Sequence, residues 1–132
     1  MPPQATPVEI VTAWIAAANA QDVERLLQLS DPQIAIAGPR GASTGHQPLR
    51  DWLTRAGLTL ETRRAFARAN TVVLDQRGVW RTPTSGEISG ERVLASLFRT
   101  DTDRQRVVYF ARFDDLAAAL QAADLAATDA IA

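Results

Sequence analysis

The sequence predicts an α+β fold in which a curved antiparallel sheet packs against three helices from the N-terminal half, with one more helix at the C-terminus. Two observations predict this class. Apolar residues recur at helical spacing in three stretches before Gly57, and from Leu58 onward four stretches alternate as strands do. The length of 132 residues and the hydrophobic fraction of 46% suit one globular unit, so residues 1–132 are expected to form a single domain.

The first helix is expected over residues 7–20. Thr6 suits the N-cap position, Pro7 suits the first helical position, and Glu9 completes a capping box with Thr6. The apolar residues that follow share one helical face: Val8, Val11, Trp14, Ile15 and Ala18.

Two shorter helices and one strand are expected next. Asp22 suits the N-cap of a short helix through Leu29, which residues 30–32 (SDP) stop, and residues 33–37 alternate weakly as a strand. The glycines and proline of residues 38–41 predict a turn that continues neither strand nor helix. A third helix is expected over residues 48–56, with Gly57 as its C-terminal stop.

The remaining chain is expected to form four strands and a helix. The strands are predicted over residues 58–68, 71–81, 91–100 and 106–113. Residues 69–70, 82–86 and 101–104 are expected to connect them. Asp114 or Asp115 then caps an Ala-rich helix to about Ala123, beyond which the tail is expected to fray.

Composition excludes several classes of function. The formal net charge of −1 and the isoelectric point near 5.8 argue against nucleic-acid partners and against attraction to anionic membranes. Without cysteine there is no disulfide or thiolate site, and a single histidine permits no multi-histidine metal site, so no metal and no cofactor are expected. No stretch resembles a membrane span or a secretory signal, which makes the cytoplasm the expected location.

Three segments together resemble the nuclear transport factor 2-like superfamily, which includes ketosteroid isomerase-like and SnoaL-like proteins. Residues 14–22 (WIAAANAQD) are similar to the end of its first helix. Residues 44–52 (TGHQPLRDW) are similar to its third helix, and residues 113–116 (FDDL) resemble the segment that closes its last strand. The resemblance extends over residues 7–125 and rests on the order and spacing of these segments.

The resemblance implies a cystatin-like, cone-shaped sheet with a mainly apolar cavity at its open end. A small hydrophobic or amphipathic organic molecule is the implied ligand. The resemblance also implies a homodimer formed through the outer face of the sheet.

The catalytic residues of the characterised relatives do not transfer to this chain. The tyrosine of the isomerases falls on Trp14, their base carboxylate on Gly38 and their carboxylic acid on Ser96. The epoxide-hydrolase pattern of Arg-x-Asp is reversed in Asp75-Gln76-Arg77, and Ala111 stands where a second aspartate belongs. Neither activity is expected.

Strand alternation predicts which side chains line the cavity. From the strand over residues 71–81, Gln76 and Trp80 are expected to face inward, which leaves Asp75 and Arg77 on the outer face unless a bulge reverses the phase. The full expected lining is Trp14, Trp52, Gln76, Trp80, Leu94, Ser96, Phe98, Phe110 and Arg112.

Each candidate has a structural reading beside its functional one. Arg112 in an apolar cavity implies an anionic ligand group, whereas at the rim it reaches solvent. The three tryptophans are either ligand contacts or core, and His46 is either a general base or a surface residue. Asp75 and Arg77 are either a buried acid and cation or a solvated pair.

Three functions fit this sequence. The favoured one is a small-molecule-binding protein without the isomerase or epoxide-hydrolase residues. The second is an isomerase, cyclase or hydrolase for a small lipophilic substrate, using Arg112, Ser96 and His46, or Asp75 with Arg77. The third is a homodimeric interaction module whose cone is filled by its own side chains.

Overall fold

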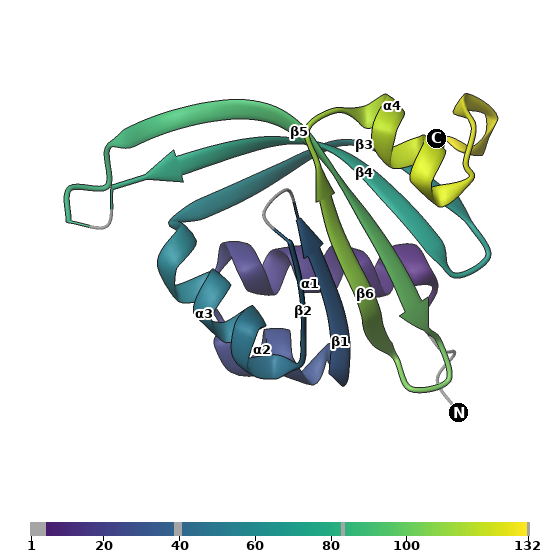
Figure 1. Ribbon diagram of the computed structural model, residues 1–132, viewed down its shortest axis with the longest axis horizontal. Helices are drawn as coiled ribbons and strands as arrows, with labels where there is room; N and C mark the ends of the chain where they lie inside the picture. The colour runs from purple at the N-terminus through teal and green to yellow at the C-terminus, as the bar shows by residue number, and fades with distance from the viewer. Residues whose placement is uncertain (1–4, 39–40, 83, 132) are drawn as a thin grey trace.

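The computed structural model describes residues 5–38, 41–82 and 84–131, so Pro39, Arg40 and Pro83 of the expected turns lie outside the described residues (Figure 1). The helices are α1 (Pro7–Asn19), α2 (Val23–Gln28), α3 (His46–Ala56), α4 (Leu116–Ala123) and a short 3-10 turn, η1 (Ala127–Asp129). The strands are β1 (Ser30–Gly38), β2 (Gly41–Thr44), β3 (Leu58–Arg68), β4 (Thr71–Arg81), β5 (Ile88–Asp101) and β6 (Arg106–Phe113).

The six strands form one sheet in the order β2-β1-β6-β5-β4-β3. Every neighbouring pair is antiparallel except β1 and β6, which run parallel, with Ala35 opposite Tyr109. The sheet is therefore mixed but mostly antiparallel, as the predicted fold class has it, with one parallel pairing that the sequence pattern does not indicate. Alternation within a strand shows which side chains share a face, but it carries no information on the direction in which distant strands meet.

Local sequence signals account for the helices of the first half. The hydroxyl of Thr6 accepts from the backbone N–H of Glu9, and the carboxylate of Glu9 accepts from that of Thr6, so the predicted capping box is confirmed. Asp22 caps α2 through the backbone N–H of Arg25. Gly57 ends α3 with φ at 56°, in the left-handed region that favours glycine.

The strand predictions are confirmed for β3, β4 and β6, whose bounds agree with the sequence pattern. β5 begins three residues earlier than expected, at Ile88, and β1 extends beyond the predicted stretch at both ends. β2 is an addition: Gly41 and the three residues after it pair with β1, whereas residues 38–41 were expected to continue no strand. All four β2 residues are small and exposed, so the segment lacks the apolar alternation that predicts a strand.

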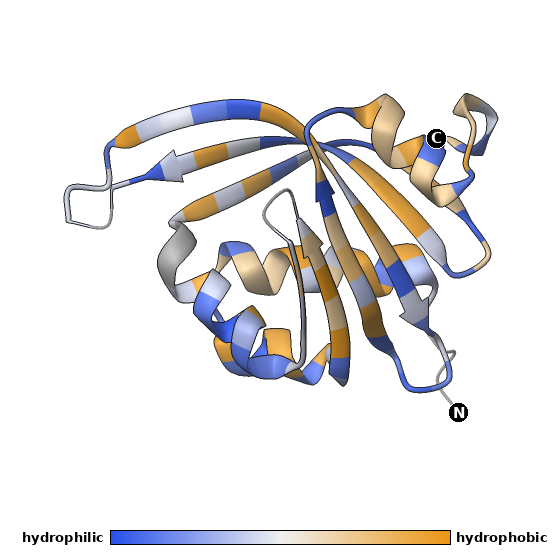
Figure 2. Ribbon diagram, viewed as in Figure 1, coloured by the Kyte–Doolittle hydropathy of each residue, from blue (hydrophilic) through white to orange (hydrophobic). Residues whose placement is uncertain are grey.

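The sheet buries apolar side chains on both faces. α1, α2 and α3 cover its inner face, and α4 lies on its outer face (Figure 1). Apolar side chains of the helices pack against the sheet in two clusters, one on each face. Along the long β4–β5 hairpin, hydrophilic residues interrupt the apolar ones toward the tip (Figure 2). On the outer face, Ala119, Ala123 and Leu125 cover Val73 and Leu97.

The C-terminal tail is ordered, contrary to the expectation that it frays. Ala130 forms a bridge with Phe66, and the backbone N–H of Ile131 donates to the carbonyl of Ala65 at 2.8 Å. These bonds satisfy backbone groups on the free edge of β3. Across the described residues, no helix has the length and apolar character needed to cross a membrane.

Candidate ligand-binding site

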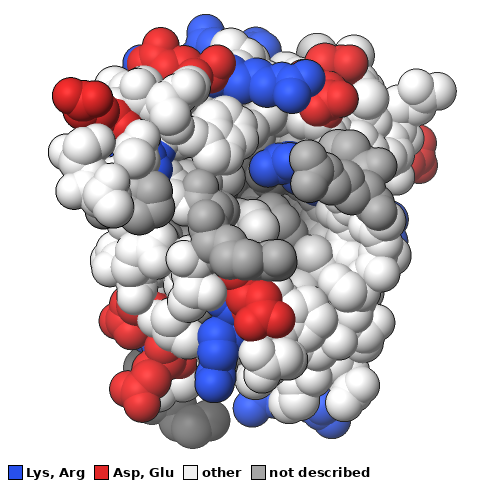
Figure 3. All heavy atoms as spheres, turned by 60° about the vertical axis from the view of Figure 1, so that its left-hand side comes forward, with Lys and Arg blue, Asp and Glu red and all other residues white. Residues whose placement is uncertain are grey.

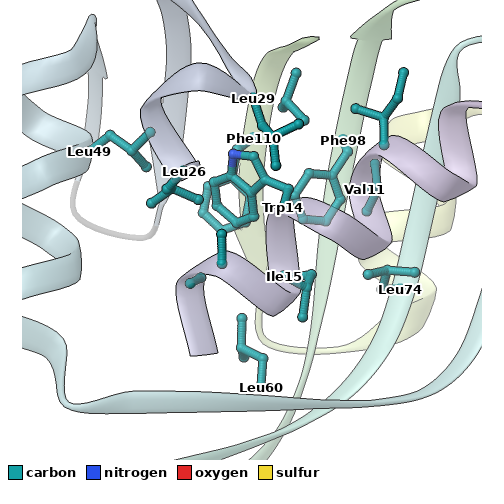
Figure 4. Close-up of a cluster of buried hydrophobic side chains, with 14 of the residues drawn as sticks. Val11, Trp14, Ile15, Leu26, Leu29, Leu49, Leu60, Leu74, Phe98 and Phe110 are labelled. Atoms are coloured by element: carbon teal, nitrogen blue, oxygen red, sulfur yellow. The ribbon is translucent and has the colours of Figure 1, made fainter. Parts of the chain in front are cut away.

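An aromatic cluster fills the interior of the curved sheet. The ring of Trp14 lies 5.2 Å from that of Phe98 and 4.9 Å from that of Phe110, measured between centroids. Trp52 stacks on the other side of Trp14 at 6.1 Å. Aliphatic side chains from α1, α2, α3 and the sheet surround these rings (Figure 4). The space beneath α1 is therefore packed core.

The polar side chains inside the sheet satisfy one another. The hydroxyl of Ser96 donates to Oε1 of Gln76 at 2.6 Å, and Nε2 of Gln76 lies 3.3 Å from the hydroxyl of Thr62. Ser96 and Gln76 are fully buried. Because the hydroxyl proton of Ser96 is engaged by Gln76, Ser96 has no group directed at a ligand.

A pocket of about 340 Å³ lies where the aromatic cluster ends, between α3, the β1–β2 hairpin and β6. We call it the mouth pocket. The face of the molecule that carries α3 and the long hairpin is hollowed, and uncharged side chains dominate the hollow while charged ones stand at its edges (Figure 3). The lining residues are Ile36, Ala37, Gly38, Gly41, Ser43, Pro48, Asp51, Trp52, Phe110 and Arg112.

The periodicities of the elements bring these side chains together. Pro48, Asp51 and Trp52 follow the i, i+3, i+4 spacing of one helical face of α3. Phe110 and Arg112 are two positions apart on β6 and share its inner face. Phe110 contacts both Trp14 and Trp52 and so forms the wall between the core and the mouth pocket.

Arg112 supplies the positive charge of the mouth pocket. Its side chain is half-buried, and no residue that the structure describes accepts a hydrogen bond from it or forms an ion pair with it. An unpaired guanidinium beside apolar surface loses hydration without receiving an acceptor in exchange. Asp51 supplies a negative charge, and its carboxylate accepts from Nε2 of Gln47 at 2.9 Å.

Three of the nine expected lining residues border the mouth pocket: Trp52, Phe110 and Arg112. The structure places five others in the packed core: Trp14, Gln76, Leu94, Ser96 and Phe98. Trp80 is half-buried farther along β4, next to Gly78. The expected inward phase of β4 and β5 agrees with the structure, but the cavity these residues were expected to line is filled by their own side chains.

The expected catalytic combinations are dispersed. Ser96 and Arg112 are neighbours across β5 and β6, yet the Ser96 side chain is turned to Gln76. His46 lies at the start of α3, in a different cleft, where Nε2 is 2.9 Å from the carbonyl of Ser30.

Asp75 and Arg77 lie on the outer face of β4, as the strand phase predicts. Asp75 is nevertheless buried, with 6% of its surface exposed, and pairs with Nε of Arg64 at 3.3 Å. Arg77 is paired with Glu61 on β3 and with Glu91 on β5 in a cross-strand ladder. Neither side chain lines the mouth pocket.

Sequence reasoning missed the lining residues that come from the β1–β2 hairpin, such as Ile36 and Gly38, and two from α3, Pro48 and Asp51. The signal for the last two was present, because a helix that directs Trp52 into a pocket also directs the residues one and four positions before it toward the same side. Ile36 and Gly38 were missed because their position depends on the β1–β2 hairpin. Within the described ranges, no three His, Asp or Glu side chains gather as a metal site would require.

The sequence matches no family model and no curated protein. By fold, the chain is similar to solved structures described as NTF2-like proteins and SnoaL-like polyketide cyclases. The structure from Shewanella denitrificans, described as SnoaL-like, is 15% identical with a TM-score of 0.72, over 88% of this chain and 97% of that one.

Two similar structures contain small molecules. A protein with a ketosteroid isomerase-like fold from Catenulispora acidiphila, in complex with trimethylamine, is 21% identical with a TM-score of 0.68, over 94% of this chain and 98% of that one. TerC, co-crystallized with polyporic acid, is 17% identical with a TM-score of 0.69, over 89% and 98% of the two chains. At these identities the similarity establishes the fold, and this chain has the NTF2-like fold.

Proposed function

We propose that this protein binds a small amphipathic organic monoanion in the mouth pocket. The apolar part of the ligand lies against Trp52 and Phe110, and its carboxylate or other anionic group accepts from Arg112. The observation that carries the proposal is the half-buried guanidinium of Arg112, which has no acceptor among the described residues at the edge of an otherwise mainly apolar pocket. Charge-assisted pairing with a planar anion supplies the missing acceptor.

The size and charge of the pocket narrow the ligand class. Its volume of about 340 Å³ lies near the lower end of the range of about 300–1,000 Å³ for small-molecule sites. The carboxylate of Asp51 lines the same pocket and would repel a second negative charge on the ligand, so a monoanion is favoured over a dianion. Fold relatives with trimethylamine and polyporic acid bound support the use of this fold for small organic ligands.

Binding without turnover fits the residues better than catalysis does. Where the resemblance to the isomerases requires a base, the lining has Gly38, and where it requires an acid, Ser96 is buried and bonded to Gln76. The enzyme alternative therefore shifts to Asp51 as the only carboxylate among the described lining residues, with Arg112 as the anion contact.

The test is calorimetric titration of the protein with 1-naphthoate and, in parallel, with the neutral 1-naphthamide. Arg112→Gln is expected to weaken naphthoate binding about tenfold or more, as loss of a charged hydrogen bond does, and to leave naphthamide binding nearly unchanged. Arg63→Gln removes the same charge from an exposed position on β3 and serves as the control. No saturable binding of either probe, or equal losses in the two variants, would contradict the proposal.

The filled interior favours a second candidate, a protein-interaction module. The packed rings of Trp14, Phe98 and Phe110 occupy the space beneath α1 among the described residues. A homodimer through the outer sheet face belongs to this candidate. It must use the surface beyond α4, where the Arg77 ladder lies and Val93 is half exposed. Sedimentation equilibrium tests it, since a monomer at micromolar concentration would exclude this dimer under those conditions.

A further inference from the structure

A second cleft lies on the opposite side of α3 from the mouth pocket. It has a volume of about 420 Å³ and opens between α2, the start of β1, α3 and the start of β6. His46 and Arg50 reach it from α3, and Arg106 reaches it from β6. We call it the basic cleft. It shares no lining residue with the mouth pocket.

Arg106 is the informative residue of the basic cleft. It is half-buried, and Asp101 stands opposite it in the register of β5 and β6. The carboxylate of Asp101, however, accepts from the backbone N–H groups of Asp103 and Arg104 and pairs with the guanidinium of Arg104. The acid positioned to neutralise Arg106 is therefore engaged in the turn.

Arg50 is exposed, unlike Arg106, but it also lacks a charged partner. Neither Arg50 nor Arg106 has an ion pair or a side-chain hydrogen bond among the residues described in the structure. Glu24 is the one acid among the described lining residues, so with His46 neutral the lining carries a net charge of +1. This positive site is found in a chain whose overall formal charge is −1.

The neighbouring surface extends the same charge. Another cleft adjoins the basic cleft, and Gln28 and Arg106 line both of them. Arg25 and Arg104 also line the adjoining cleft. Glu9, the acid of that cleft, is bound to the backbone N–H of Thr6. Arg104 is paired with Asp101, whereas Arg50 and Arg106 face the basic cleft without an intramolecular acid. Two such guanidinium groups in one cleft can recognise a phosphate through several N–H donors at once.

We propose that the basic cleft binds a phosphate group, held by Arg50 and Arg106. His46 also lines the cleft, but its Nε2 faces the carbonyl of Ser30, which can only accept, so Nε2 carries the proton and is not available to the phosphate. The two sources of such a group are inorganic phosphate and an organic phosphate monoester. The volume of the cleft accommodates either.

The experiment is an NMR titration of the 15N-labelled protein with inorganic phosphate and, separately, with phenyl phosphate at low ionic strength. Saturable shifts confined to the residues around the basic cleft are expected. Arg50→Ala and Arg106→Ala are each expected to raise the Kd at least about fivefold, and Arg63→Ala is expected to leave it unchanged. Tighter binding of phenyl phosphate identifies a monoester as the ligand, and equal binding identifies the free anion.

A variant that is expected to bind phosphate more tightly gives a result that misfolding cannot explain. Glu24→Gln removes the acid of the basic cleft and is expected to lower the Kd for phosphate about twofold or more, a result that an unfolded protein does not give. Shifts that never saturate, or a loss in Arg63→Ala equal to that in Arg106→Ala, would show diffuse attraction and overturn the proposal. Naphthoate binding in Arg106→Ala is expected to be unchanged, which separates this site from the mouth pocket.

Discussion

The indole N–H of Trp14 donates to the hydroxyl of Ser30 at 2.9 Å, and that hydroxyl donates in turn to the carbonyl of Leu26 at 2.7 Å. All three residues are buried. The relay fixes the tilt of the indole, and with it the position of Phe110, the wall of the mouth pocket. A single serine thereby couples the end of α2 and the start of β1 to the aromatic cluster.

Ser30→Ala is expected to destabilise the fold by about 1–3 kcal/mol, because it leaves the Trp14 N–H buried without an acceptor. Urea denaturation of the wild type and the variant measures the loss of unfolding free energy, provided that the two proteins have the same m-value. In the Trp14→Phe background, which has no indole N–H, the same serine substitution is expected to cost less. An unchanged denaturation midpoint for Ser30→Ala would show that water replaces the hydroxyl.

Gly78→Ala is expected to destabilise the protein by about 1–2 kcal/mol through overpacking. A Cβ at this position meets Cδ2 of Leu94 at 2.9 Å and Cδ1 of Leu58 at 3.2 Å. The two leucine carbons are the ends of flexible side chains and can yield, whereas the third neighbour, Cη2 of Trp80 at 3.3 Å, belongs to a rigid ring. The cost is therefore moderate but not negligible.

Gly90 provides the matched control in the adjoining strand. A Cβ there meets nothing within 4 Å. Gly90→Ala is expected to be neutral or to stabilise the protein by about 0.5 kcal/mol through the unfolded chain. Thermal unfolding of the two variants side by side checks the difference, and equal Tm values would contradict it.

Ala69→Gly is expected to stabilise the protein by about 0.5–1 kcal/mol. Ala69 occupies the left-handed region at φ 53° in the β3–β4 turn, where a Cβ is unfavourable. Two residues earlier, Ala67 lies within β3. Ala67→Gly, the control, is expected to lose about 0.5–1 kcal/mol. Chemical denaturation of both variants decides whether turn strain is present.

Acid is expected to weaken the start of α1. The hydrogen bond from the Thr6 backbone N–H, aided by the Thr6 hydroxyl, holds the pKa of the Glu9 carboxyl below its usual range. The ionised Glu9 carboxylate therefore stabilises the folded state fully above the pKa that glutamate has in the unfolded chain, about 4.3. This stabilisation is lost as the pH falls through the lower pKa of Glu9 in the folded state. Glu9→Gln keeps an acceptor oxygen but does not titrate. The stability difference between wild type and this variant should shrink below about pH 4, and a constant difference would refute the assignment.

The sequence predicts the elements well where a chemical signal is local. The capping box of Thr6 and Glu9, the stop at Gly57 and the alternation of β4 are read from neighbouring residues, and each agrees with the structure. β2 escapes prediction because its stability comes from pairing with β1 and not from its own side chains.

The candidate site is less predictable for a geometric reason. Strand phase correctly places Gln76 and Ser96 inside, but it does not reveal that they bond to each other. Whether an inward side chain lines a cavity or fills one depends on the separation between the helices and the inner face of the sheet. In the interior, Trp14 of α1 packs directly against Phe98 of β5, which leaves Trp52 and Arg112 to border the mouth pocket at the open edge.

The parallel pairing of β1 with β6 has a consequence for the order of assembly. Its partners are distant in the chain, as the pairing of Ala35 with Tyr109 shows. Closing so long a loop costs conformational entropy, which is offset only once the other strands of the sheet have paired. We therefore expect the β1–β6 pairing to form late in folding. The mouth pocket is lined by residues of both β1 and β6, so it forms where these two strands pair. A ribosome must therefore release the residues of β6 before the pocket exists, and chains that stop short of β6 have no site at which a ligand can guide folding.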